Sequence, residues 1–212
     1  MRSPIVIVGA GIAGLSTAWH LARAGADEVL VLEGEAAVGR HSTAQNAAIL
    51  RTWSPDPVLC ALAARGAEFL REPPPEFAVG PLSDRRGLIL ANSRSAAEMR
   101  ADYALVRGEV PRFEELDARG FHERAPHFAP LEVLGDRRAF HFPDEGRIDL
   151  GALVSAFVRG LRELGVELRT GCRVNGLSVQ AGRVVCPPTG SGGAPPAGNR
   201  VLAAGASGGE LG

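Results

Sequence analysis

The chain has no lysine among its 212 residues, so its 23 Lys and Arg positions are all arginine. They stand against 24 acidic residues, which leaves a formal net charge of −1. This even balance excludes the strongly basic surface that nucleic-acid-binding and polybasic membrane proteins carry. We therefore expect no nucleic-acid partner.

Cysteine and long apolar runs are scarce as well. Cys60, Cys172 and Cys186 are widely spaced and form no C-x-x-C pair, which excludes a disulfide scaffold and favours a reducing, cytoplasmic setting. The histidines stand too far apart for a local metal motif, so we expect no metal. No apolar run reaches the roughly 18 residues of a membrane helix. The apolar start, residues 1–21, is interrupted by glycines, which argues against a secretory signal.

The strongest pattern in the sequence lies near the N-terminus. Residues Ile5 to Val8 read I-V-I-V, a run typical of a buried parallel strand. A G-x-G-x-x-G loop follows, and behind it apolar residues recur at helical spacing as far as Gly25. Residues Glu28 to Leu32 form a second expected strand, which ends at Glu33. The loop consists of Gly9, Ala10, Gly11, Ile12, Ala13 and Gly14.

This arrangement predicts a dinucleotide site. Gly9 permits the tight turn, Gly11 lets the backbone approach a pyrophosphate, and Gly14 lets the helix pack close to the strand. The carboxylate of Glu33 can accept hydrogen bonds from ribose hydroxyls, and it disfavours a 2′-phosphate. The alternative is a glycine-rich turn without a ligand. It is disfavoured because the strand, the helix and the acidic strand end all agree.

The residues around this loop resemble a known family. The spacing G-x-G-x-x-G-x-x-x-A, followed by Gly25, resembles the extended fingerprint of FAD-binding proteins. The segment from Gly39 to Ala48, G-R-H-S-T-A-Q-N-A-A, resembles that of the D-amino-acid oxidase superfamily, which includes glycine oxidase, sarcosine oxidase and bacterial D-amino-acid dehydrogenases. Its small side chains let the backbone approach a flat ring, and its hydroxyls and Arg40 can bind phosphate. The alternative is a Ser/Thr/Ala loop that caps a helix starting near Gln45.

The resemblance implies a fold, a cofactor and a set of contacts. The fold is expected to be α/β: a Rossmann-like FAD-binding domain of the GR2 type with an inserted α+β substrate lobe. The FAD-binding domain would comprise residues 1–78 and 146–212, and the substrate lobe residues 79–145. His41 would lie near the flavin ring, as a catalytic candidate; a loop histidine bonded to backbone or phosphate is the alternative. Besides Glu33 and the glycine-rich loop, the implied cofactor contacts are Arg40, His41, Ser42, Thr43, Ala47, Val174, Ala204 and Gly205.

The resemblance also implies a reaction. Hydride transfer from the Cα–H of an amine to flavin N5 would oxidise the C–N bond of a D-amino acid, glycine or an N-methyl amino acid. Relatives continue past the last strand of this chain, so we expect an incomplete chain or a second polypeptide that completes the fold. Two alternatives stay open: a non-catalytic FAD- or ADP-binding fragment or subunit, and an NAD-dependent dehydrogenase, which residues 39–48 disfavour.

Periodicity and breakers predict the remaining elements. Residues 56–72 and 150–164 carry apolar side chains at helical spacing and predict two helices. The run Pro73-Pro74-Pro75 predicts a boundary between lobes. A short helix is predicted over residues 113–119. The predicted strands are 86–91, 138–142 and 200–206.

Overall fold

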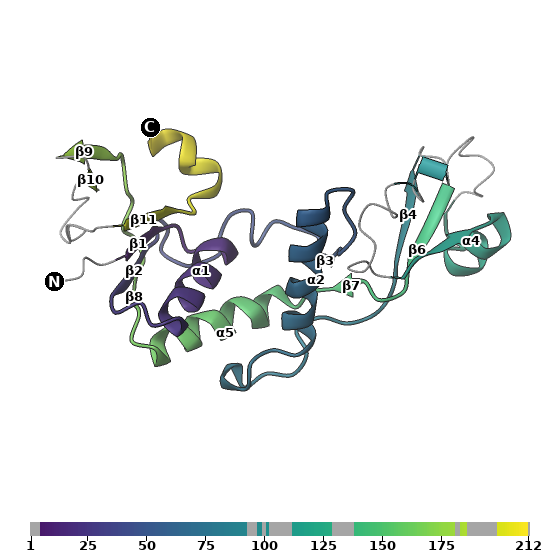
Figure 1. Cartoon of the computed structure of the whole chain (residues 1–212), viewed down its shortest axis with the longest axis horizontal. Coiled ribbons are helices and arrows are strands. Elements are labelled where there is room, and N and C mark those ends of the chain that lie inside the picture. Colours follow the sequence, from purple (N-terminus) through teal and green to yellow (C-terminus); the bar gives the residue numbers. More distant parts are fainter. Residues whose placement is uncertain are drawn as a thin grey trace. The chain divides into compact units, whose positions relative to one another are not determined.

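The computed structural model describes residues 5–92, 97–98, 101, 112–128, 138–180, 183–185 and 199–211. The chain divides into two compact units (Figure 1). The first comprises Met1–Ala47, Pro75–Ala78 and Leu150–Gly212, and the second comprises Ala48–Pro74 and Val79–Asp149.

A parallel sheet forms the centre of the first unit. Its strands, in the order β11-β1-β2-β8, are β1 (Ile5–Val8), β2 (Val29–Leu32), β8 (Glu167–Arg169) and β11 (Asn199–Leu202). β1 and β2 are buried almost throughout, as their unbroken Val/Ile/Leu runs predict for a sheet covered on both faces. One face packs on Val174 and carries Val6, Val8, Leu30 and Leu32.

Two helices of the first unit pack against each other, α1 (Ile12–Arg23) and α5 (Leu150–Glu163). The ring of Trp19 on α1 lies 5.1 Å from that of Phe77 in η1 (Pro75–Phe77) and 6.0 Å from that of Phe157 on α5, centroid to centroid. A Cβ at Gly160 would lie 2.8 Å from the indole nitrogen of Trp19. The absence of a side chain at Gly160 therefore lets the indole sit against α5.

The second unit is built from antiparallel strands. The strands are β3 (Ile49–Leu50), β4 (Leu88–Asn92), β5 (Glu114–Leu116), β6 (Arg138–Phe142) and β7 (Gly146–Arg147). One sheet has the order β4-β6-β5, and β3 pairs with β7.

The second unit also contains two helices, α2 (Pro57–Arg71) and α4 (Ala118–Arg124). Its apolar side chains form two clusters, one around Trp53, Phe140 and Phe142 and the other around Leu116, Phe121 and Ala139. A further hairpin, β9 (Ser178–Gln180) with β10 (Arg183–Val185), belongs to the first unit.

A buried carboxylate joins parts of the second unit that are distant in sequence. Glu145 is fully buried. Its Oε1 accepts hydrogen bonds from the backbone nitrogens of Thr52, at 2.6 Å, and Trp53, at 3.1 Å, and from the Thr52 hydroxyl, at 3.0 Å. The turn between β6 and β7 is therefore tied to the segment that follows β3.

Most predicted elements are confirmed. The helix over 56–72 is α2, whose N-cap Asp56 accepts hydrogen bonds from the backbone nitrogens of Val58 and Leu59, and the helix over 150–164 is α5. The predicted helix over 113–119 is wrong, because β5 and then α4 occupy that region. No helix begins near Gln45, where the chain forms turns.

The boundaries of the two units differ in part from the predicted domain boundaries. Residues Ala48–Pro74, including α2, cluster with the second unit, and the chain re-enters the first unit at Leu150. The assignment of residues 1–78, 79–145 and 146–212 to a flavin domain and a substrate lobe stays a prediction. Two non-glycine residues with positive φ, Ala48 (54°) and Ala78 (47°), lie where the chain passes between units.

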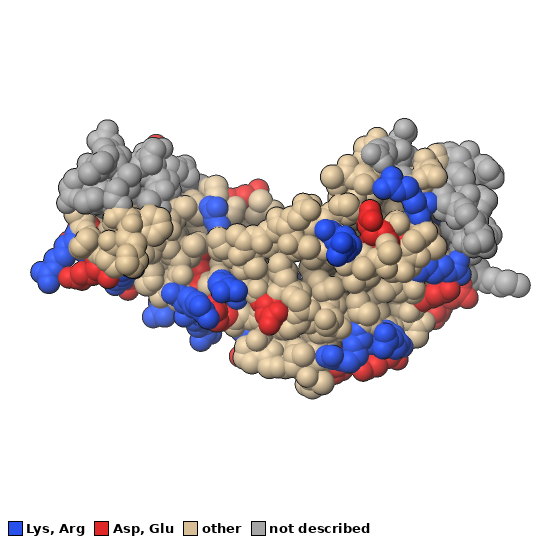
Figure 2. All heavy atoms as spheres, turned by 180° about the vertical axis from the view of Figure 1, so that it is seen from behind, with Lys and Arg blue, Asp and Glu red and all other residues tan. Residues whose placement is uncertain are grey.

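Two surface properties bear on the class of protein. On the face seen in Figure 2, arginine and acidic side chains of the described residues lie close to one another rather than in fields of one sign. Among the described residues, no helix has the length and apolar character needed to span a membrane.

Candidate functional site

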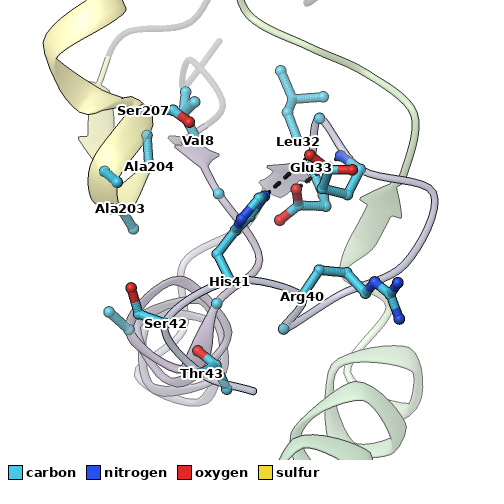
Figure 3. Close-up of a pocket in the computed structure, with 18 of the residues that line it drawn as sticks. Val8, Leu32, Glu33, Arg40, His41, Ser42, Thr43, Ala203, Ala204 and Ser207 are labelled. Atoms are coloured by element: carbon cyan, nitrogen blue, oxygen red, sulfur yellow. Dashed lines mark hydrogen bonds and ion pairs between the residues drawn. The ribbon is translucent and has the colours of Figure 1, made fainter. Parts of the chain in front are cut away.

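A cavity opens at the carboxyl ends of β1, β2 and β11 (Figure 3). Its walls come from the glycine-rich loop and from the segments that follow β2, β8 and β11. Ligands of open parallel sheets bind at this edge. The cavity holds about 250 Å³, less than the roughly 300–1,000 Å³ that encloses a drug-sized ligand.

The three motif glycines are required for different reasons. Gly9 has a φ of +104°, and a Cβ there would lie 2.3 Å from the carbonyl oxygen of Ala203. A Cβ at Gly14 would lie 1.9 Å from the carbonyl oxygen of Gly9, so close helix–strand packing demands glycine. At Gly11 the nearest atom to such a Cβ is the Thr43 hydroxyl oxygen, at 3.2 Å. A side chain at Gly11, which lines the cavity, would therefore press on the Thr43 hydroxyl, and that hydroxyl would have to shift by a few tenths of an ångström.

Glu33 is held in place by backbone donors from two directions. Its Oε2 accepts a hydrogen bond from the nitrogen of Ala10 at 2.7 Å, and its Oε1 accepts one from the nitrogen of Glu35 at 2.9 Å. A carboxylate has about four acceptor positions, so two remain for ligand hydroxyls. Two backbone donors thus hold the carboxylate in one orientation at the edge of the cavity.

The N-terminus of α1 faces the cavity without a counter-charge in its first turn. Its N-cap residue, Gly11, offers no side-chain oxygen, and its first turn holds no acidic residue. The nitrogen of Ile12 donates a hydrogen bond to the Thr43 hydroxyl at 3.0 Å. A helix N-terminus attracts phosphate through its dipole and through those N–H groups that no side chain caps. Thr43 therefore links the loop at 39–48 to the helix that would hold a pyrophosphate.

His41 faces the segment that follows β2. Its Nε2 is 3.0 Å from Oε1 of Glu35, and Figure 3 shows the ring turned toward the end of β2, where Glu33 lies. Arg40 also lines the cavity, but its side chain extends away from His41 (Figure 3). The side-chain amide of Asn46 donates hydrogen bonds to the carbonyl oxygens of Ser42 and Thr43, which fixes the loop.

Most of the predicted site residues come together. Those that line the cavity are Gly9, Gly11, Ile12, Ala13, Glu33, Arg40, His41, Ser42, Thr43, Val174, Ala204 and Gly205. Ala10 and Gly14 do not line the cavity. The backbone nitrogen of Ala10 donates a hydrogen bond to Glu33, and Gly14 lets α1 pack against the carbonyl group of Gly9. Ala47 is exposed and does not line the cavity. Reasoning from the sequence missed several lining residues, among them Glu35, Arg173 and Ser207. Glu35 is acidic and two residues beyond Glu33, a signal that could have found it.

Comparison with known proteins identifies the family. The family model described as DAO, FAD dependent oxidoreductase, matches residues 4–212. The chain belongs to this family. The predicted resemblance and the Rossmann-like α/β fold are thereby confirmed, and FAD is the family's cofactor.

Individual relatives extend the comparison. The chain is 27% identical to glycine oxidase from Bacillus licheniformis over 218 residues, covering 99% of this chain and 56% of that protein. The crystal structure of L-proline dehydrogenase from P. horikoshii superposes with a TM-score of 0.81 at 21% identity, over 99% of this chain and 55% of that one. Glycine oxidase from Geobacillus kaustophilus gives a TM-score of 0.78 at 21% identity, over 99% and 57%. The chain thus spans about half the length of these relatives.

The residues present fit the FAD of this family. Gly11 on the cavity wall, the carboxylate of Glu33 held by backbone donors, and the N-terminus of α1, whose first turn carries no acidic side chain, fit a pyrophosphate flanked by a ribose. The family match also decides against the NAD-dependent alternative.

Proposed function

We propose that this protein oxidises the C–N bond of an amino acid with FAD. The observation that carries the proposal is the family match over residues 4–212, joined to the cavity at the strand ends of the first unit. The proposed substrate is a D-amino acid, glycine or an N-methyl amino acid. It would lose a hydride from Cα and a proton from nitrogen, and water would convert the imine to a 2-oxo acid and ammonia, or to a 2-oxo acid and methylamine when the substrate is an N-methyl amino acid. Bound FAD supplies the two-electron acceptor for this chemistry.

The proposed roles of the site residues follow from their positions. Glu33 would accept hydrogen bonds from the ribose hydroxyls, and the N-terminus of α1, with Thr43, would hold the pyrophosphate. Val174 would flank the adenine, since it lines the cavity and is nine-tenths buried. Ala204 and Gly205 would border the cofactor from the segment that follows β11.

His41 is the proposed catalytic residue, and one variant separates its two possible roles. His41→Asn removes the imidazole and keeps a hydrogen-bonding side chain. A role in the reaction predicts flavin reduction at least about tenfold slower with FAD affinity unchanged. A role in holding the loop or the phosphate predicts the reverse, a loss of FAD affinity with the reduction rate of the bound flavin preserved.

The proposed function has a direct test. The purified chain is titrated with FAD while its visible absorption is recorded, and the complex is then mixed anaerobically with single amino acids, including glycine, sarcosine and both enantiomers of alanine and proline. Bleaching of the flavin band by one of them supports the proposal. A yellow complex that no amino acid bleaches counts against catalysis by this chain alone.

The second candidate is a FAD-binding subunit that a further segment or polypeptide completes. It is favoured by β11, one of the two edge strands of the described sheet, where Leu202 is 53% exposed while the neighbouring β1 is almost entirely buried. An exposed edge strand can accept another strand. A chain that binds FAD and becomes active only when the C-terminal half of a glycine oxidase is supplied separately would support this candidate.

A further inference from the structure

A second cavity lies within the second unit and has none of its described lining residues in common with the cofactor site. It holds about 580 Å³ and is formed by residues at the start of β4, by β6, by α4 and by the turn after α4. We refer to it as the α4 pocket. The lining residues that matter here are Arg86, Phe121, Arg124, His127, Phe128 and His141. Its volume lies within the roughly 300–1,000 Å³ of small-molecule sites.

The polar side chains that line the α4 pocket, among the residues that the structure describes, are basic: two arginines and two histidines, with no acidic residue in this described lining. Arg86 pairs with Asp84, and Nη2 of Arg124 lies 3.2 Å from Oε2 of Glu114. Asp84 and Glu114 bind these arginines but do not line the pocket. Each guanidinium carries five N–H donors, more than these pairs use, so the pocket still offers donors to an anionic guest.

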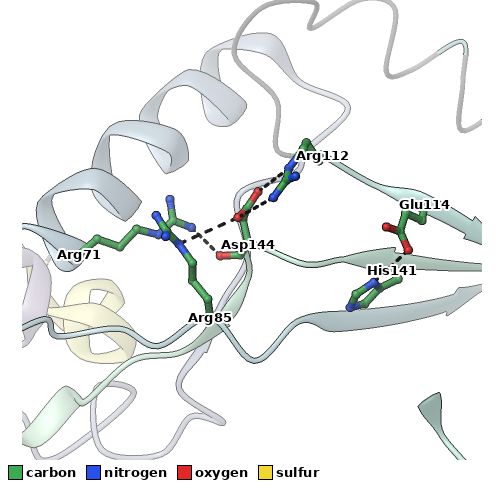
Figure 4. A network of polar contacts seen from close by, with 6 residues as sticks. All are labelled: Arg71, Arg85, Arg112, Glu114, His141 and Asp144. Atoms are coloured by element: carbon green, nitrogen blue, oxygen red, sulfur yellow. Dashed lines mark hydrogen bonds and ion pairs between the residues drawn. The ribbon is translucent and has the colours of Figure 1, made fainter. Parts of the chain in front are cut away.

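His141 is positioned by its neighbours on two strands. Gly87 has a φ of +77°, and a Cβ there would lie 2.5 Å from Nε2 of His141, so only glycine leaves room for this imidazole. On the next strand, Glu114 is directly opposite His141, and its Oε2 lies 3.5 Å from the histidine Nδ1 (Figure 4). The carboxylate of Glu114 therefore contacts two basic side chains, those of His141 and Arg124.

Two aromatic side chains of the α4 pocket differ in their exposure to solvent. Phe121 is buried in the cluster with Leu116 and Ala139, whereas Phe128, from the turn after α4, is 69% exposed. A large exposed aromatic side chain on the rim of a pocket of this size is a surface that a ligand can cover. The combination of an aromatic wall and a few basic groups is typical of sites for organic anions.

We propose that the α4 pocket binds a small organic carboxylate with an aromatic or aliphatic body. The carboxylate lies against Arg124 and His141, with Arg86 beside them, and the body packs on Phe121 and Phe128. This site is separate from the cofactor cavity, since the two share no lining residue. The inference does not depend on the proposed oxidation.

Binding of 3-phenylpropionate tests the proposal, measured by isothermal titration calorimetry on the full chain in excess FAD. Its neutral amide and inorganic phosphate serve as comparison probes. We expect Arg124→Gln to weaken binding by about tenfold to a hundredfold, the effect of losing a hydrogen bond to a charged group. Arg119→Gln is the matched control, because Arg119 lies on the same helix and pairs with Glu123 but does not line the pocket. We expect the control to bind as the wild type does.

A second variant covers the case in which Arg124→Gln disturbs folding. Phe128→Ala removes an exposed side chain and is expected to weaken binding at least fivefold without lowering the melting temperature, while Leu164→Ala, another exposed apolar residue, leaves binding unchanged. The proposal is overturned if 3-phenylpropionate does not bind at millimolar concentration, or if the neutral amide binds equally well. It is likewise overturned if phosphate binds and the carboxylate cannot displace it, or if the control variants lose as much affinity as the test variants.

Discussion

The backbone nitrogen of Ala10 donates a 2.7 Å hydrogen bond to Oε2 of Glu33. This contact joins the loop after β1 to the end of β2, and with the donor at Glu35 it holds the carboxylate in one orientation. A group already fixed in the bound geometry loses little freedom when a ligand arrives. Glu33 is therefore a structural link as well as the proposed contact of the ribose, and its substitution should affect both.

Glu33→Gln should weaken FAD binding by about tenfold to a hundredfold. The amide has one acceptor oxygen, so it cannot satisfy both backbone donors and the ribose hydroxyls, and a hydrogen bond to a charged group contributes about 1.5–3 kcal/mol. Quenching of FAD fluorescence measures the dissociation constant. The control is Glu28→Gln. Glu28 is an exposed acidic residue that lies just before the first residue of β2, at the opposite end of the strand from Glu33. Equal losses in the two variants would count against a direct contact between Glu33 and the cofactor.

Two glycine substitutions should have opposite effects on stability. Gly14→Ala places a Cβ 1.9 Å from the Gly9 carbonyl oxygen, so either the helix or the strand must shift and the first unit should fail to fold or melt well below the wild type. Gly66→Ala, within α2, meets no atom within 4 Å. Since alanine is favoured over glycine inside a helix by roughly 0.5–1 kcal/mol, this variant should melt slightly higher. Thermal unfolding followed by circular dichroism compares the two.

Removal of the Glu145 carboxylate should destabilise the second unit by about 3 kcal/mol or more. Glu145→Ala leaves two backbone nitrogens and the Thr52 hydroxyl buried without an acceptor, and each such group costs about 1–3 kcal/mol. Glu145→Gln keeps one acceptor oxygen and should cost clearly less.

Tryptophan fluorescence can report the unfolding of each unit separately. The chain has two tryptophans, Trp19 in the first unit and Trp53 in the second. In a Trp19→Phe background, urea unfolding followed by fluorescence reports the second unit, and in a Trp53→Phe background the first. We expect Glu145→Ala to lower the midpoint of the second unit and to leave that of the first unchanged. A shift in the first unit alone would contradict the assigned role.

The sequence predicted the elements of the first unit, which contains the cavity at the strand ends, better than those of the second unit. β1, α1 and β2 follow from a continuous apolar run, a glycine loop and helical spacing, all of which are local signals. The cavity residues follow because the segments after β8 and β11 resemble those of a family whose fold brings strand ends together. Glu35 escaped notice because the pattern ends at Glu33, and the contact between Glu35 and His41 depends on how the loop turns.

The errors in the second unit have a common physical cause. Glu114 and Glu115 have no preference for strands, yet β5 forms because the segment pairs in register with β6, opposite His141, Phe140 and Ala139. The burial of Glu145 was not visible either, because its partners lie more than ninety residues earlier. Pairing between distant segments overrides local propensity, and one sequence read alone carries no signal for it.

Asp84 should make the second unit more stable at neutral than at acidic pH. Its Oδ1 accepts a 2.7 Å hydrogen bond from the backbone nitrogen of Arg147. This bond, together with the charges of Arg86 and Arg147, lowers the pKa of Asp84 below its ordinary 3.8, although partial burial acts in the opposite direction. The folded state therefore favours the ionised carboxylate more than the unfolded state does. The stabilisation is present above the unfolded pKa and disappears as the pH falls through the folded pKa.

Asp84→Asn tests this dependence. In the Trp19→Phe background the wild type should exceed the variant in unfolding midpoint near pH 7, and the difference should shrink as the pH falls below about 4. Glu72→Gln, an exposed acid at the end of α2, should show no such convergence. A difference that stayed constant, or that grew on acidification, would mean that the ionised carboxylate of Asp84 does not stabilise the turn before β4. The asparagine oxygen still accepts the bond from Arg147, so the variant isolates the charge from the hydrogen bond itself.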